Sequence, residues 1–237
     1  MPKILGILGG MGPLSTVKFM EKVIRYSPVT GEQEHLRMLV DNRPEIPDRT
    51  AAILGKGPSP LPYLQDSARL LEQWGAEVLA MPCNTAHHFI REVQAAVSIP
   101  LLDMLQFLAR EMERQLPPDT PVALFATTGS IRANLFQNYL SRFHLIIPPP
   151  DIQESLIMEA IYGPEGVKAH GDMALNREKL LRALKRLTAP RPQAVVAGCT
   201  EIALALEGAS VNLPLFDPLD ILAHRVVEYC YGESFSF

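Results

Sequence analysis

The stretch that decides the fold is Ala76-Glu77-Val78-Leu79-Ala80-Met81-Pro82-Cys83-Asn84-Thr85, where a hydrophobic run ends at a cysteine and polar residues. The other half of the chain contains a similar stretch, Ala194-Val195-Val196-Ala197-Gly198-Cys199-Thr200. Short hydrophobic runs predict buried strands of a parallel sheet, and polar residues at the carboxyl ends of such strands are typical of a functional site. Two cysteines at equivalent strand ends therefore predict one site built from two similar halves.

Strands and helices alternate along the rest of the chain. The hydrophobic pattern predicts strands at residues 3–8, 36–41, 77–81, 99–102, 121–126, 143–147, 194–197 and 213–216. Helical periodicity occurs at residues 14–26, 62–74, 85–97, 106–115 and 177–187. Parallel strands need crossover connections, so this alternation predicts an α/β fold with mainly parallel sheets flanked by helices.

Two matched features indicate an internal duplication. Gly12 and Gly129 each lie in a small-residue turn after a first strand, and they are 117 residues apart. Cys83 and Cys199 are 116 residues apart. We therefore expect two pseudo-symmetric lobes, residues 1–104 plus 212–237 and residues 105–211, with the active site in the cleft between them.

Composition excludes several classes of function. The chain has 237 residues, a net charge of -4 and no basic run, so we expect no nucleic-acid partner. No apolar stretch is long enough to span a bilayer, and the first residues do not form a signal peptide, so we expect no membrane partner. Three cysteines do not suggest a disulfide framework, which favours a reducing, cytoplasmic location.

Two facing thiols suit one particular reaction, the removal of a proton from one face of a carbon and its replacement on the other. One cysteine must begin as a thiolate and the other as a thiol. Because free cysteine has a pKa of roughly 8.5, lowering it by about two units requires roughly 2.7 kcal/mol. A helix N-terminus supplies about 0.3–1 kcal/mol, so we expect backbone donors and the substrate ammonium to contribute the remainder.

Five segments together carry a family resemblance. They are residues 9–13 (GGMGP), 42–50 (NRPEIPDRT), 82–87 (PCNTAH), 126–130 (ATTGS) and 198–201 (GCTE). In this order they resemble the aspartate/glutamate racemase superfamily, specifically its cofactor-independent aspartate racemase branch. Glutamate racemases usually have histidine after the second Cys-Thr pair, whereas Glu201 stands there in this chain.

The resemblance implies an isomerase that interconverts L- and D-aspartate, with no cofactor or metal, and a homodimer. It implies catalytic roles for Cys83 and Cys199. We expect Arg49, held by a proline-rich segment, and Lys168 to bind the distal carboxylate of the amino-acid substrate. The remaining substrate-binding candidates are Met11, Asn84, Thr85, Thr127, Thr128 and Thr200, around the α-carboxylate.

Other interpretations stay open at this point. Cys83, His87 and Cys199 could bind a transition metal, although no further ligand has a convincing spacing. The threonines could simply cap helices, and Cys230 fits a buried core position without a function. The substrate could be glutamate or a broader range of amino acids, and from a different class the chain could be a silent amino-acid-binding protein. Residues 55–60 form a glycine- and proline-rich segment that could act as a lid.

Overall fold

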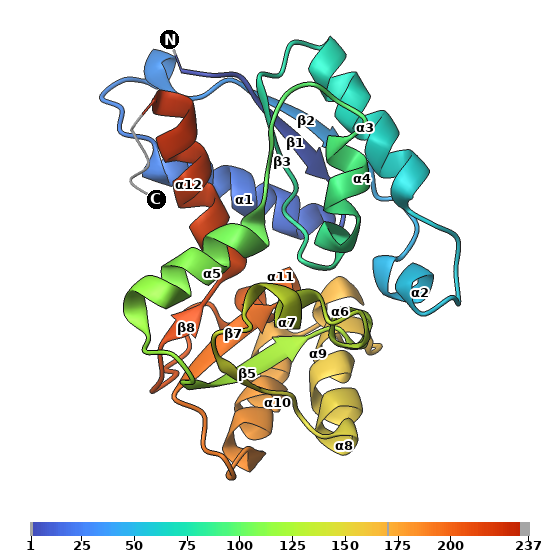
Figure 1. Ribbon diagram of the computed structural model, residues 1–237, viewed down its shortest axis with the longest axis vertical. Helices are drawn as coiled ribbons and strands as arrows, with labels where there is room; N and C mark the ends of the chain where they lie inside the picture. The colour runs from blue at the N-terminus through green and yellow to red at the C-terminus, as the bar shows by residue number, and fades with distance from the viewer. Residues whose placement is uncertain (1, 170, 233–237) are drawn as a thin grey trace. The chain divides into compact units, whose positions relative to one another are not determined.

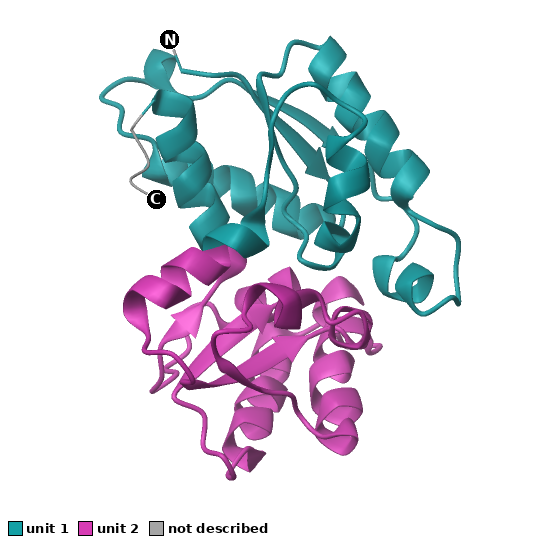
Figure 2. Cartoon of the chain, in the orientation of Figure 1, with its two compact units in different colours: residues 1–107, 219–237 teal, residues 108–218 magenta. Residues whose placement is uncertain are grey.

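The computed structural model describes residues 2–169 and 171–232, and the chain divides into two compact units (Figures 1 and 2). Unit 1 comprises Met1–Phe107 and Leu219–Phe237, and unit 2 comprises Leu108–Pro218. The helix α5 (Met104–Gln115) contains the boundary at residue 107. Each unit is described separately below.

Unit 1 contains a sheet of four parallel strands in the order β2-β1-β3-β4. The strands are β1 (Leu5–Gly9), β2 (Met38–Asn42), β3 (Val78–Ala80) and β4 (Leu101–Leu102). Leu5 and Ile7 pack with α1 (Pro13–Tyr26) and α12 (Pro218–Tyr231), whereas Leu8 packs with α3 (Leu61–Gln73) and α4 (Ile90–Gln94). Successive side chains of a strand point to opposite faces, so this alternation places helices on both faces of the sheet (Figure 1).

Unit 2 repeats this arrangement with β5 (Pro121–Ala126), β6 (His144–Ile146), β7 (Ala194–Gly198) and β8 (Leu215–Phe216), in the order β6-β5-β7-β8. Its helices include α6 (Thr128–Arg132), α7 (Leu135–Tyr139), α10 (Met173–Arg186) and α11 (Thr200–Leu206). A continuous helical stretch consists of α8 (Pro150–Ile152), the π-helix η3 (Gln153–Met158) and α9 (Glu159–Tyr162). Shorter elements of the chain are η1 (Glu32–Glu34), α2 (Arg49–Ile53), η2 (Thr85–Phe89) and η4 (Val167–Ala169).

The two sheets share one strand order, which confirms the predicted α/β fold with two similar halves. Cys83 follows β3 and Cys199 follows β7, and these strands occupy the same place in the two sheets. The sequence thus places each cysteine at the carboxyl edge of its own sheet.

Two local features differ from the expectations. The predicted helix at 85–97 is the 3₁₀-helix η2 followed by α4, because the His87 ring bonds the Cys83 carbonyl while the His87 N–H bonds Asn84. The strand β8 pairs with β7 and so belongs to unit 2, although the sequence suggested its return to the first lobe. The helix α12 does pack on the first sheet.

Among the described residues, no helix is both long and apolar enough to cross a bilayer.

Candidate active site

Cys83 lies in a short buried turn after β3. Its side chain is 6% exposed and packs in an apolar cluster with Met81 and Ala86. The Cys83 N–H donates to the Met81 carbonyl at 2.8 Å, which tightens the chain just beyond the strand. The turn therefore holds the thiol at the carboxyl edge of the first sheet.

The His87 side chain holds this turn through two hydrogen bonds to the backbone. Its ring Nδ1–H donates to the Cys83 carbonyl at 2.8 Å, and its Nε2 accepts from the Met104 N–H at 3.2 Å. Burial lowers the pKa of His87, against the opposing effect of Asp103, which favours the neutral ring that these two bonds require. Both ring nitrogens are hydrogen-bonded to backbone groups, so His87 positions the Cys83 backbone. It is not arranged as a base or a metal ligand.

Asn84 is a buried polar residue of unit 1 that directly follows Cys83. The side chain is 2% exposed, and neither its Nδ2 nor its Oδ1 has a hydrogen-bond partner. Buried polar groups almost always have partners, and leaving an amide without them costs about 1–3 kcal/mol. An unsatisfied donor and acceptor beside Cys83 suit a small polar ligand. Thr85, also predicted to bind substrate, is buried next to it.

The glycine-rich turn before α1 is explained by contacts inside the protein. Gly10 has a φ of +89°, and a Cβ there would lie 2.4 Å from the Arg43 carbonyl carbon. The Gly10 N–H donates to Thr16 Oγ1 at 3.0 Å, and that hydroxyl donates to the Gly12 carbonyl at 3.1 Å. Met11, expected near the substrate, is 2% exposed and packs in the apolar cluster that also contains Cys83.

Arg49 is held by its own proline-rich segment. Its side chain is buried, and Nη1 donates to the carbonyls of Ile46 and Pro47, both at 3.0 Å. The helix α2 begins at Arg49 and is capped by Asp48, which accepts from the Ala51 N–H at 2.7 Å. The two carbonyls of this proline-rich segment therefore orient the guanidinium.

In unit 2, Cys199 belongs to a buried polar cluster. The Cys199 thiol donates to Glu201 Oε2 at 2.9 Å, and Thr200 Oγ1 donates to the same oxygen at 3.0 Å. Lys168 Nζ donates to Glu201 Oε1 at 2.8 Å. Cys199, Thr200 and Glu201 are 5%, 2% and 4% exposed, so this network is almost fully shielded from water.

The charges in this cluster act in opposite directions on its two acids. Burial raises the pKa of Cys199 well above its usual range, and the Glu201 carboxylate raises it further, while Lys168 opposes both. Burial alone would raise the pKa of Glu201, but the Lys168 ammonium and the hydrogen bonds from Cys199 and Lys168 hold it below its usual value. Cys199 is therefore a thiol beside an ionised carboxylate.

Thr127 and Thr128 have local partners. Thr127 caps α6, since its hydroxyl oxygen accepts from the Ser130 N–H at 3.2 Å. The Thr128 hydroxyl donates to Glu154 Oε1 at 2.7 Å, and its N–H points to Met158 Sδ at 3.3 Å. Both donors of Thr128 are thus engaged within unit 2.

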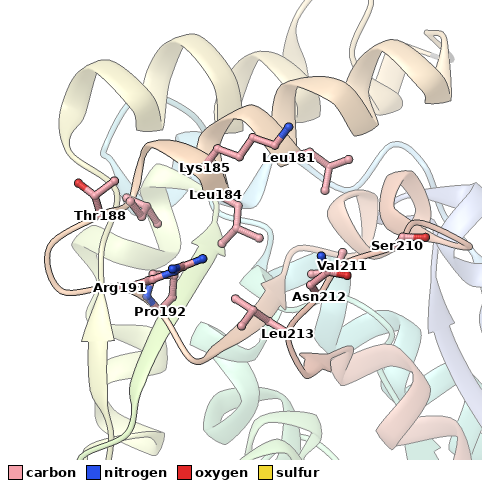
Figure 3. Close-up of a pocket in the computed structure, with 11 residues that line it drawn as sticks. Leu181, Leu184, Lys185, Thr188, Arg191, Pro192, Ser210, Val211, Asn212 and Leu213 are labelled. Atoms are coloured by element: carbon pink, nitrogen blue, oxygen red, sulfur yellow. The ribbon is translucent and has the colours of Figure 1, made fainter.

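A cavity of about 570 Å³ lies elsewhere in unit 2 (Figure 3). Leu181 and Leu184 project into it from α10, and the segments before β7 and β8 complete its lining. It therefore lies at the amino ends of these strands, whereas Cys199 follows the carboxyl end of β7. None of the predicted site residues lines it.

Neither Cys230 nor a metal-binding cluster forms part of the candidate site in the described part of the chain. Cys230 belongs to the apolar cluster under α1 and α12, and burial raises the pKa of its thiol to about 12. Within residues 2–169 and 171–232, no group of three or more His, Cys, Asp or Glu side chains is arranged to hold a metal ion.

Comparisons with known proteins identify the family of this chain. The family model described as Asp/Glu/Hydantoin racemase matches residues 8–226. The chain belongs to this family. Its relatives include the broad specificity amino-acid racemase RacX of Bacillus subtilis, which is 24% identical over 94% of this chain and 96% of its own length.

Solved structures of racemases share the fold. Picrophilus torridus aspartate racemase has a TM-score of 0.83 and 28% identity, covering 97% of this chain and 94% of its own. Francisella tularensis glutamate racemase, solved with D-glutamate, has a TM-score of 0.62 and 15% identity, covering 100% of this chain and 85% of its own. At the latter identity the likeness concerns the fold alone. Membership of a racemase family makes this protein an isomerase by class.

Two side chains of this racemase gain importance only from the structure. Glu201 separated the branches in sequence but had no predicted role, and the structure shows it bonded to Cys199. Gln153 was not singled out at all. It is 5% exposed, its Nε2 donates to the Ala126 carbonyl, and its Oε1 has no partner. A glutamine within a helical stretch gives no signal in sequence, because its importance depends on packing against a distant strand end.

Proposed function

We propose that this racemase interconverts L- and D-aspartate without a cofactor, using Cys83 and Cys199 as its two acid–base groups. The observation that carries the proposal is the pair of buried cysteines at equivalent strand ends of two sheets with the same order. The family assignment and the likeness to an aspartate racemase of 28% identity support it.

The reaction needs one group on each face of the α-carbon. A base removes the α-proton from one face, and an acid delivers a proton to the other, so the configuration inverts. For the opposite enantiomer the two groups exchange roles. The two groups proposed for this requirement are the thiols of Cys83 and Cys199.

The polar cluster of unit 2 supports a protonated Cys199 in the resting site, because Glu201 accepts a hydrogen bond from its thiol. Cys199 is then the acid for one enantiomer, with Cys83 as the base, and the roles exchange for the other. Glu201 acts as a positioning residue, since it orients and retains the Cys199 proton. The Lys168 ammonium keeps this carboxylate ionised inside the protein.

Substrate recognition follows from the remaining side chains. We propose that Asn84 and Thr85 bind the α-carboxylate together with Thr127 and Thr200, and that Met11 forms an apolar wall. Thr128 contributes indirectly, because its hydroxyl oxygen accepts from Gln153 Nε2 at 3.3 Å.

Arg49 and Lys168 bind the distal carboxylate, because each carries a positive charge and N–H donors that suit a carboxylate. This pair of cations is what favours a dicarboxylic amino acid. We also propose that the racemase works as a homodimer in the cytoplasm. Sedimentation analysis of the purified protein tests the dimer.

A second candidate is a broader substrate range, favoured by the likeness to the broad specificity racemase of Bacillus subtilis. Aspartate and glutamate differ by one methylene, which a site separates by only about 1–3 kcal/mol. Some turnover of glutamate is therefore expected even if aspartate is the main substrate.

The test is chiral chromatography of single-enantiomer amino acids after incubation with the pure protein. We expect aspartate to be inverted fastest, with activity retained after EDTA and hydroxylamine treatment. Loss of activity after either treatment would contradict the two-thiol mechanism, and no inversion of any amino acid would favour a silent binding protein.

A further inference from the structure

Gln153 has an amide whose orientation is fixed by its neighbours. Its nitrogen lies 2.9 Å from the carbonyl oxygen of Ala126 and 3.3 Å from Thr128 Oγ1. Only the amide nitrogen can donate to a carbonyl oxygen, so the reversed amide is excluded. The oxygen Oε1 is therefore the atom left as a buried acceptor without a partner.

This acceptor is anchored at the same sheet edge as Cys199. Ala126 is the last residue of β5 and is paired with Gly198, the residue before Cys199. Gln153 also begins the π-helix η3, and π-helical turns are frequently found at functional sites. The irregular helix thus brings a glutamine amide to the carboxyl end of β5, which is paired with β7, the strand that Cys199 follows.

The chemistry of the amino-acid substrate identifies what this oxygen can bind. Both carboxylates of aspartate are acceptors, so they cannot satisfy a carbonyl oxygen, whereas the α-ammonium has three N–H donors. The oxygens of Glu201, the buried carboxylate of this unit, are already bonded, Oε1 by Lys168 and Oε2 by Cys199 and Thr200.

We propose that Gln153 Oε1 accepts a hydrogen bond from the α-ammonium group of the substrate, which makes Gln153 a specificity-determining residue for amino acids. This inference rests on the proposed racemase function. It assigns to the described site a group that distinguishes an amino acid from the corresponding ammonium-free acid, because a buried acceptor left unpaired penalises the analogue.

The test compares two ligands by isothermal titration calorimetry. L-Aspartate carries the ammonium, and succinate is the dicarboxylate without it. In Gln153→Leu we expect aspartate affinity to fall about 10- to 100-fold, the range for a hydrogen bond to a charged group, with succinate affinity little changed. In Gln153→Glu, whose carboxylate keeps an acceptor and adds negative charge, the ratio of aspartate to succinate affinity should rise instead.

Gln137→Leu is the matched control, because Gln137 is another glutamine of unit 2 with a buried Oε1 that has no partner. Its Nε2 donates to the Ile131 carbonyl, so its amide joins α7 to α6. The control should leave the ratio unchanged. An equal loss of aspartate and succinate affinity in Gln153→Leu would overturn the ammonium contact, and so would an unchanged affinity ratio in Gln153→Glu. Either result would leave the proposed racemase function standing. Failure of the unmodified protein to bind aspartate would overturn the proposed function and this inference together.

Discussion

The thiol of Cys199 donates to Glu201 Oε2 at 2.9 Å, in a cluster where both residues are about 5% exposed or less. Burial and the neighbouring carboxylate both favour the protonated thiol, so its pKa lies well above the usual range. The same carboxylate is held ionised by Lys168. The two cysteines of this racemase therefore have different surroundings, although they follow equivalent strands.

Glu201→Gln should move the pH dependence of turnover. Cys199 must be protonated to act as the acid for one enantiomer, so turnover of that enantiomer is lost as the pH rises through the pKa of Cys199. The glutamine removes the negative charge that raises this pKa and leaves Lys168, which lowers it. We expect the basic limb of the pH–rate profile to shift to lower pH for that enantiomer, in measurements that start from L-aspartate and from D-aspartate.

Glu178→Gln is the control for this change, because Glu178 is an exposed carboxylate on α10 of the same unit. Its profile should match that of the unmodified protein. A Glu201→Gln profile that keeps its basic limb would remove Glu201 from the control of the Cys199 proton.

Replacing Cys83 or Cys199 by alanine should abolish racemisation, because in the proposed mechanism each enantiomer needs both a base and an acid. Cys230→Ala should retain turnover, since Cys230 lies in the apolar cluster of unit 1 and has no proposed role. Chiral chromatography of both aspartate enantiomers measures this. Near-normal turnover by Cys83→Ala or Cys199→Ala would exclude that cysteine from the mechanism.

His87→Gln should destabilise the protein and remove part of its pH dependence. His87 makes two buried bonds to backbone groups, so we expect a loss of about 1–3 kcal/mol in the free energy of unfolding. Its folded-state pKa lies below the ordinary value of 6.5, so the unfolded chain binds more protons in the window below that value. Stability from His87 is complete above pH 6.5 and falls as the pH drops below it.

His88→Gln provides the comparison, because His88 is the adjacent residue and is exposed. Urea titrations between pH 5 and 8 should show the acid-side loss of stability in the unmodified protein and in His88→Gln. The same loss in His87→Gln would show that another group causes it.

Arg49→Ala should discriminate between substrates. In the proposed role the guanidinium forms charge-assisted bonds to the distal carboxylate of aspartate, which alanine as a substrate lacks. We expect a large loss of kcat/KM for aspartate and a much smaller loss for any residual alanine turnover. Equal losses for both substrates would instead assign Arg49 to the α-carboxylate or to support of the site.

The sequence was sufficient for the sheets and for the positions of the two cysteines. Eight hydrophobic runs correspond to β1–β8, because the strands of a parallel sheet covered by helices are largely apolar. The Arg49 segment was also predictable, since its prolines restrict the backbone and its carbonyls hold the guanidinium.

The polar network was not predictable, because it depends on partners far apart in the chain. Lys168 and Glu201 are 33 residues apart, and Gln153 and Ala126 are 27 apart. The periodicity at 85–97 predicted one helix, but the His87 side chain competes for a backbone carbonyl and the helix divides. Such choices between local and distant hydrogen bonds leave no pattern in composition or spacing.

The most direct test of the two-thiol account is incubation of L-aspartate with the pure protein in D₂O, followed by chiral chromatography with mass detection. Removal of the α-proton on one face and delivery from a solvent-exchanged thiol on the other predict D-aspartate that carries one deuterium at the α-carbon. The mixture should approach equal amounts of the two enantiomers. D-Aspartate formed without deuterium, or deuterium incorporation with no inversion, would contradict the account.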